Sequence, residues 1–325
     1  MTSRARQTRK GPARWLYVAA AIAVLASACS SRTTSDSTTS TTAPAAQVTA
    51  GPVVNCGNAV ASYAPTETLP PPGDMPAGTY MAEIQRRGRL IAGVSADTLL
   101  FGYRNPLTGH LEGFDIDLIH AVANAIFGDP NKVEFKVLTY AQRIPNLLSG
   151  EVDIVADVMT VNCERWEQIA FSSQYFDAGQ KILVRTDSAA TGIADLAGTR
   201  MCAANGSTNI DNLKNYPEIK VVPVDDISDC MVLFQQGRVD SVTGDDTVLD
   251  GFVAQDPYAK IIGAPLTSEP YGLGISRLHP EFVRFVNGVL ENLREDGTWK
   301  QMYTHWLAPT GPAPEPPPAV YGRNP

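Results

Sequence analysis

The stretch GFDIDLIHAVANAIF, residues 113–127, decides the fold. Its apolar side chains recur at the i, i+3, i+4 spacing of a helix with one buried face, and these are Leu118, Ile119, Val122, Ala123 and Ile126. Asp115 has the side chain of an N-cap, and Asp117 follows in the first turn, where a negative charge favours a helix. The stretch therefore predicts a helix over 115–127 that packs against a core.

Short runs rich in β-branched residues alternate with helical patterns along the chain. They are residues 89–95, 133–138, 152–158, 181–185, 200–204, 220–224, 241–243, 261–264 and 273–276. Strands that alternate with helices are typical of an α/β architecture. The length of 325 residues is enough for two modest domains.

Residues 1–28 have the composition of a secretory signal peptide. Five positive charges and no acid precede an apolar run over 15–26 that is too short to span a bilayer comfortably. The sequence Leu25-Ala26-Ser27-Ala28-Cys29 then resembles a bacterial lipobox, which predicts lipidation of Cys29 and a lipid-anchored position on the extracytoplasmic face of the cell membrane. Ordinary cleavage beside an incidental cysteine is the alternative.

Export changes what the charges and the cysteines imply. Loss of the five positive charges changes the formal net charge from −8 to −13, which gives no support to nucleic-acid binding. Cys56, Cys163, Cys202 and Cys230 then lie in an oxidising compartment, and their even number predicts two disulfides with three possible connectivities. Neither they nor the four scattered histidines have the spacing of a metal site, so we expect no metal and no cofactor.

Two segments lack the composition of a folded domain. Residues 29–74 begin with a run of Ser, Thr and Ala that buries little apolar surface, so we expect a flexible tether behind the lipidated cysteine. Residues 309–325 are rich in proline, and we expect a disordered or polyproline-like tail. The folded part is then expected over 75–308.

Four blocks of the folded part resemble, in order, the polar amino-acid solute-binding proteins of bacterial ABC importers (family 3), among them glutamate-, aspartate- and glutamine-binding lipoproteins. The first block is 113–126, and the second runs from 152 through Thr160, Glu164 and Arg165 to Ser172. The third is 237–245 and the fourth is 271–306. Together they extend over essentially the whole folded part.

The resemblance implies a two-lobed periplasmic-binding-protein fold of type II, in which two crossover hinge strands join the lobes. Carried over by position, lobe one is 75–178 with 268–308, and lobe two is 179–267. Closure about the hinges buries a ligand between the lobes and presents a changed surface to a partner. The resemblance thus implies a monomeric binding protein that delivers an amino acid to an ABC permease and catalyses nothing.

The resemblance also implies which residues hold the amino-acid backbone. Arg165 matches the arginine that grips the α-carboxylate through two parallel charge-assisted hydrogen bonds. Thr160 matches the threonine whose hydroxyl and amide take other ligand atoms. The ammonium group is then expected to meet the backbone carbonyl of Val158 and the carboxylate of Asp245.

Further contacts are implied on both lobes. Ser207 and Thr208 are expected to present amides and hydroxyls at a helix N-terminus, which suits an anion. Phe101 matches an aromatic residue at the pocket edge, where it would pack on the aliphatic part of the ligand. Tyr140 is expected to do the same, with a surface or core position as the alternative.

Ligand specificity depends on the residues that meet the ligand's side chain. Arg143 resembles an arginine of the glutamate/aspartate-binding subgroup, and it favours an acidic ligand. Ser95 departs from that subgroup, which has another arginine there, and Asp97 lies where an acid would disfavour an acidic side chain. Glutamine or asparagine therefore stays open as the ligand.

Placed on the implied lobes, Cys202 lies in a lobe-two strand and Cys230 in a helix on the same sheet, so we expect these two to form a disulfide. Cys56 is then expected to pair with Cys163 beside the pocket. The partner also stays open, because a membrane sensor would use the closed-lobe surface as an ABC permease does.

Overall fold

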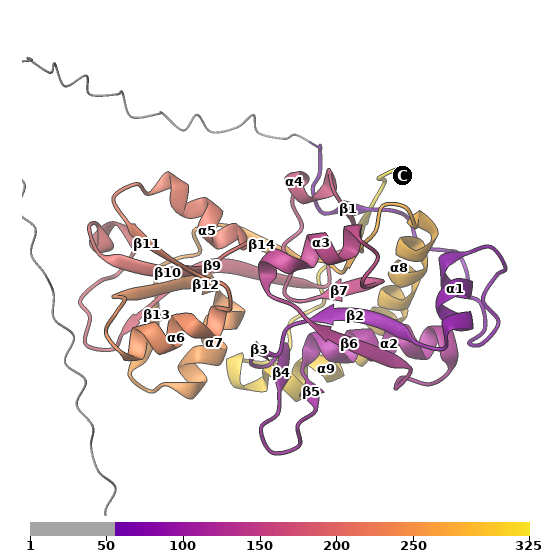
Figure 1. Cartoon of the computed structure of the whole chain (residues 1–325), viewed down its shortest axis with the longest axis horizontal. Coiled ribbons are helices and arrows are strands. Elements are labelled where there is room, and N and C mark those ends of the chain that lie inside the picture. Colours follow the sequence, from indigo (N-terminus) through magenta and orange to yellow (C-terminus); the bar gives the residue numbers. More distant parts are fainter. Residues whose placement is uncertain (1–55) are drawn as a thin grey trace, which may run out of the picture. The chain divides into compact units, whose positions relative to one another are not determined.

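The computed structural model describes residues 56–325, and the predictions that fall on 1–55, including the signal peptide and Cys29, lie outside it. The described chain forms two lobes, each built on its own sheet, and Figure 1 shows lobe two in salmon and orange beside the magenta and yellow of lobe one. In lobe one the strands follow the order β6 (Val133–Val137), β2 (Leu90–Val94), β7 (Ile154–Ala156), β15 (Gly274–Ile275) and β8 (Ala170–Phe171). A small sheet beside it consists of β3 (Asp97–Thr98), β4 (Gly102–Arg104) and β5 (Leu111–Glu112).

Lobe two has a sheet of its own with mixed strand directions. Its order is β11 (Lys220–Val224), β10 (Arg200–Ala204), β12 (Ser241–Asp245), β9 (Phe176–Arg185) and β13 (Ala259–Ile262). β10 runs parallel to β11 and β12, whereas β9 is antiparallel to both β12 and β13. The first half of β9 also pairs with β14 (Ser268–Tyr271), and this antiparallel pair is the crossover between the lobes.

Helices cover the sheets. Those of lobe one are α1 (Tyr80–Arg87), α2 (Phe114–Phe127), α3 (Arg143–Leu148), α4 (Cys163–Trp166), α8 (Pro280–Glu295) and α9 (Thr298–Leu307). Those of lobe two are α5 (Thr208–Asn212), α6 (Ile227–Gln235) and α7 (Asp246–Gln255). Short 3₁₀ turns are η1 (Tyr140–Gln142), η2 (Ile193–Leu196), η3 (Leu213–Asn215) and η4 (Ala308–Thr310). None of the helices in residues 56–325 has the length and apolarity that crossing a membrane needs.

The helix predicted from the deciding stretch is present as α2, and its predicted apolar face is fully buried against β2, β7, α8 and α9. It begins at Phe114 rather than Asp115, with Gly113 as its N-cap at φ +136°. A Cβ atom on residue 113 would lie 2.2 Å from the backbone oxygen of Phe101, so only glycine allows this approach. Asp115 is therefore not the cap.

Both ends of the described chain are more ordered than their composition predicts. β1 (Ala61–Ser62) pairs in parallel with β16 (Val320–Tyr321), so part of the expected tether and part of the expected tail form one small sheet on lobe one. The expected tether and tail thus contain paired strands at 61–62 and 320–321, which the prediction of a flexible segment and a disordered tail did not include. Composition misses this pairing because each strand has only two residues, and a few anchoring side chains such as Tyr63 provide the buried surface.

Both predicted disulfides are present. Cys202 in β10 is bonded to Cys230 in α6, and Cys56 is bonded to Cys163 in α4. The first joins a strand of lobe two to the helix that packs on it. The second joins the start of the described chain to lobe one.

Candidate functional site

A small cavity lies between the lobes, and both lobes line it. Lobe one contributes Tyr140, Arg143, Val158, Thr160 and Arg165. Lobe two contributes Ser207, Thr208, Asn209, Ile227, Gly244, Asp245 and Val248. Sequence reasoning missed Asn209, Ile227, Gly244 and Val248, since no motif marks them and they reach the cavity only through the packing of lobe two.

Two arginines of lobe one converge on the same backbone oxygen of lobe two. Nη2 of Arg143 and Nη2 of Arg165 each donate to the carbonyl oxygen of Gly206 at 3.1 Å. Nη1 of Arg143 donates to the carbonyl of Asp157, and Nη1 of Arg165 to that of Thr160, both at 2.7 Å. Burial and the neighbouring Arg143 lower the pKa of Arg165 to about 9. The two guanidinium groups therefore form a buried positively charged cluster whose N–H groups need hydrogen-bond acceptors.

Opposite these cations lies Asp245, at the end of β12. Its carboxylate accepts from Nδ2 of Asn209 at 2.8 Å and from the hydroxyl of Tyr271 at 2.7 Å. Burial and the nearby Glu269 raise the pKa of Asp245 to about 7. Glu269 itself accepts from the hydroxyl of Thr208 at 2.6 Å. Sequence reasoning missed Glu269, because only the fold brings this residue of β14 to the site.

Val158 has a backbone conformation that residues other than glycine rarely adopt, with φ +40°. Its N–H donates to Oδ2 of Asp115 at 2.8 Å, and the hydroxyl of Tyr175 donates to the other oxygen of Asp115 at 2.7 Å. Burial raises the pKa of Asp115 to about 6, against the lowering effect of these two donors. These contacts fix the orientation of the backbone groups of Val158, and strained residues held in this way are common at functional sites.

Asp157 directly follows β7 and is a second acid that sequence reasoning missed. Its side chain is buried, and neither carboxylate oxygen has a hydrogen-bond partner within the described residues. Burial raises its pKa well above the usual range, and Arg143 acts in the opposite direction. A buried acceptor without a donor is rare and calls for an explanation.

Three predicted residues do not line the cavity. Phe101 is 0% exposed and packs edge-on against Phe176 and Tyr271, so it belongs to the core and not to the pocket edge. Ser95 donates its hydroxyl to Asp97 at 2.7 Å. Asp97 in turn accepts from the backbone N–H of Ser228 at 3.2 Å, so it links the lobes beside the cavity.

The lobes are closed in this structure. The cavity volume is about 10 Å³, which is about the space of one water molecule. The hydroxyls of Thr160 and Thr208 lie 3.3 Å apart across the interface. Any molecule larger than water must therefore enter while the lobes are apart, and closure then surrounds it.

The site sets buried cations from one lobe against buried acids from the other. A zwitterion that carries a carboxylate and an ammonium group fits such an arrangement, because each group meets its opposite charge away from water. Within residues 56–325 no group of three or more His, Cys, Asp or Glu side chains is arranged to hold a metal ion.

Comparisons with known proteins find several relatives. The chain is 40% identical over 204 residues to the glutamine-binding protein of Geobacillus stearothermophilus, covering 62% of this chain and 78% of that protein. It is 30% identical over 253 residues to the glutamate-binding protein of Corynebacterium efficiens, covering 74% of this chain and 86% of the other. The structure of the cysteine-binding protein of Campylobacter jejuni superposes with a TM-score of 0.68 at 27% identity, over 70% of this chain and 93% of that one.

The profile of the bacterial extracellular solute-binding proteins of family 3 matches residues 90–309. This match covers more than half of the chain, and the two-lobed architecture is the one that the structural relatives have. The protein is thus a solute-binding protein rather than an enzyme, and it belongs to family 3 of the bacterial extracellular solute-binding proteins.

Proposed function

We propose that this protein captures a free amino acid with a carboxamide side chain, glutamine or asparagine, outside the cytoplasmic membrane and delivers it to an ABC permease. The opposed charges of the cavity suit the α-carboxylate and the α-ammonium group. The glutamine-binding and glutamate-binding relatives support a polar amino acid of this size.

The charges of the cavity assign protein contacts to the α-carboxylate and the ammonium group of the ligand. Arg165 offers a planar guanidinium to the α-carboxylate, and Thr160 lines the same cavity. Asp245 and the carbonyl of Val158 offer acceptors to the ammonium group. The carbonyl of Gly206 accepts from Nη2 of Arg165, so a bound carboxylate would replace that neutral acceptor with a charged one.

The pair Arg143 and Asp157 is the observation that favours a ligand with a carboxamide side chain. Arg143 is a buried donor that lines the cavity, and Asp157, the residue before the lining residue Val158, is a buried acceptor without a donor in the described chain. A carboxamide has one oxygen that accepts from the guanidinium and one NH₂ group that donates to the carboxylate. A carboxamide that contacts both side chains would thus satisfy them at once.

An acidic side chain satisfies Arg143 but has no hydrogen to donate to Asp157, and it meets a like charge wherever Asp157 is ionised. Like charges brought together in a site away from water cost several kcal/mol. The acidic preference that Arg143 alone predicts is therefore offset by Asp157, a residue that its sequence context does not mark. Glutamate and aspartate become the alternative that an experiment has to separate.

The test is a calorimetric titration of the full chain with L-glutamine, L-asparagine, L-glutamate and L-aspartate at one pH and one salt concentration. We expect an amide to bind more tightly than its acid, because only the amide satisfies Asp157. Tighter binding of glutamate than of glutamine, and of aspartate than of asparagine, would overturn the carboxamide assignment and restore the acidic one. Absence of binding to all four would overturn the proposed function itself.

A further inference from the structure

Arg165 lies on α4, a helix of only four residues, Cys163–Trp166. A single helical turn is not stable by itself, because its few hydrogen bonds do not offset the loss of backbone entropy. Asn162 caps it by accepting from the backbone N–H of Arg165 at 2.8 Å. The orientation of α4, and with it the direction of the Arg165 guanidinium, therefore depends on contacts from outside the helix.

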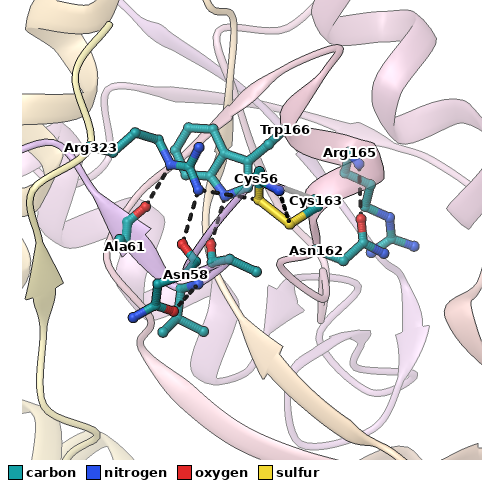
Figure 2. Close-up of a disulfide and its surroundings, with 10 residues drawn as sticks. Cys56, Asn58, Ala61, Asn162, Cys163, Arg165, Trp166 and Arg323 are labelled. Atoms are coloured by element: carbon teal, nitrogen blue, oxygen red, sulfur yellow. Dashed lines mark hydrogen bonds between the residues drawn. A yellow bond between two sulfur atoms is a disulfide. The ribbon is translucent and has the colours of Figure 1, made fainter. Parts of the chain in front are cut away.

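These contacts come from the N-terminal end of the described chain. Cys163, two residues before Arg165, is bonded to Cys56. Trp166, the residue after Arg165, donates from Nε1 to the carbonyl of Ala59 at 2.8 Å. Figure 2 shows the disulfide and the indole ring of Trp166 on this one short segment, with Arg165 on the side opposite to Arg323.

The C-terminal end of the chain completes the arrangement through Arg323. Its guanidinium carbon lies 4.1 Å from the centroid of the Trp166 ring, a cation–π contact. The same guanidinium donates to the carbonyls of Ala61 at 2.9 Å and Asn58 at 3.0 Å and approaches Sγ of Cys56 at 3.4 Å. Residues 56–62 and 320–323 thus form a terminal clasp, joined by the β1–β16 pair, that grips α4.

We propose that the terminal clasp is a positioning device for Arg165. It holds Cys163 and Trp166, which lie on the two sides of Arg165. A guanidinium already held in the binding geometry loses less conformational entropy when it meets a carboxylate. Release of the clasp should therefore lower affinity about two- to tenfold, the equivalent of ordering one long side chain.

The two disulfides differ in a way that allows a direct test. Cys202 and Cys230 are both 0% exposed, whereas Cys56 and Cys163 are only half-buried. A mild reductant applied to the folded full chain should therefore open Cys56–Cys163 and leave Cys202–Cys230 intact, which thiol mapping by mass spectrometry verifies. We expect affinity to fall by the stated factor and the amides of 163–167 to exchange hydrogen faster.

Arg323→Gln provides the same test without a redox change. Arg323→Lys keeps a cation over the indole and should lose less affinity than Arg323→Gln. Arg284→Gln is the matched control, because Arg284 donates to the carbonyl of Ala64 in the continuation of the same segment, but its guanidinium lies over the ring of Tyr63 and not over Trp166 of α4. We expect the control to keep the affinity and the slow exchange at 163–167.

L-glutamine and L-glutamate serve as probes, since both carry the α-carboxylate. The clasp acts on that shared group, so Arg323→Gln should weaken both by the same factor and leave their affinity ratio unchanged. Unchanged affinity and exchange in Arg323→Gln and in the reduced protein, or equal losses in Arg284→Gln, would overturn the proposal. If neither probe binds the unmodified protein, the proposed function fails, while exchange at 163–167 still decides on the clasp.

Discussion

At the scale of single residues, Asp157 and Arg143 should shift ligand selectivity in opposite directions. Asp157→Asn removes the charge that opposes a ligand carboxylate but keeps an oxygen that accepts from a carboxamide. We expect glutamate to gain about 10- to 100-fold in affinity relative to glutamine, because several kcal/mol of like-charge repulsion disappear. Arg143→Gln should lower the affinity for glutamate more than that for glutamine, since no cation at position 143 then offsets the acid Asp157.

Calorimetric titration of both variants with both ligands measures this selectivity. Arg165→Ala is the control, because the α-carboxylate is common to both ligands and both should lose affinity alike. An equal change for glutamate and glutamine in Asp157→Asn would mean that this acid has a structural role only.

The buried Asp245 gives a pH dependence whose sign follows from its raised pKa. The folded protein keeps the proton up to about pH 7, whereas an unfolded aspartate loses it near pH 4, so the unfolded state binds fewer protons in between. The stability of the ligand-free protein should therefore fall as pH rises from about 4 to about 7. Asp115 acts with the same sign up to about pH 6.

A bound ammonium group pairs with the ionised Asp245 and offsets the free-energy cost of burying that negative charge. The increase in Tm caused by L-glutamine should therefore be larger at pH 8 than at pH 5, which differential scanning calorimetry measures. In Asp245→Asn that difference should largely disappear. An increase of the same size at both pH values in the unmodified chain would show that Asp245 does not meet the ligand.

At the scale of elements, the loop between β10 and α5 controls how closely the lobes approach. Gly206 has φ +76°, and a Cβ there would lie 2.6 Å from Cα of Ala141 in lobe one. Gly206→Ala should therefore keep the lobes from closing and weaken ligand binding at least tenfold. Gly198→Ala is the matched control, because its φ of +75° imposes the same backbone strain while no atom lies within 4 Å of the added Cβ.

Small-angle scattering with saturating L-glutamine separates the two variants. Both should lose about 1–2 kcal/mol of stability through the left-handed backbone, but only Gly206→Ala should keep the larger radius of gyration of the open form. A compact, tightly binding Gly206→Ala would show that this contact does not limit closure.

Much of the element pattern follows from the sequence, and the differences have physical causes. The predicted strands at 200–204 and 220–224 coincide with β10 and β11, where β-branched and apolar residues are bounded by polar turns. β9 was expected from 181 but begins at Phe176, because pairing with β14 extends it through Asp177, Ala178 and Gly179, which have no strand preference of their own. Two-residue strands such as β1 and β16 are too short for any periodicity.

The candidate site follows from the sequence only in part. Residues 158–165 form one contiguous motif, and the resemblance finds Val158, Thr160 and Arg165 there. Asp157 and Glu269 are single acids that no motif marks, and only the fold shows that the first lacks a donor and that the second lies near Asp245. Phe101 was misplaced because a core aromatic and a pocket aromatic have the same sequence pattern.

At the scale of the whole molecule, lipidation of Cys29 is the prediction that decides where the protein works. Cys29 lies outside the described residues, and family membership implies only an extracytoplasmic location. Mass spectrometry of the native N-terminus should find an acylated Cys29 as the first residue. An unmodified Cys29, or cleavage at another bond, would contradict the anchor, and Cys29→Ala should then have no effect on membrane retention.

The central claim is that closure brings a carboxamide amino acid between Arg143 and Asp157 on one side and Arg165 and Asp245 on the other. A crystal structure of the protein with L-glutamine tests it most directly. We predict the α-carboxylate on the Arg165 guanidinium, the ammonium group on Asp245, and the carboxamide within hydrogen-bond distance of both Arg143 and Asp157. A ligand whose side chain leaves Asp157 without a donor would contradict the account.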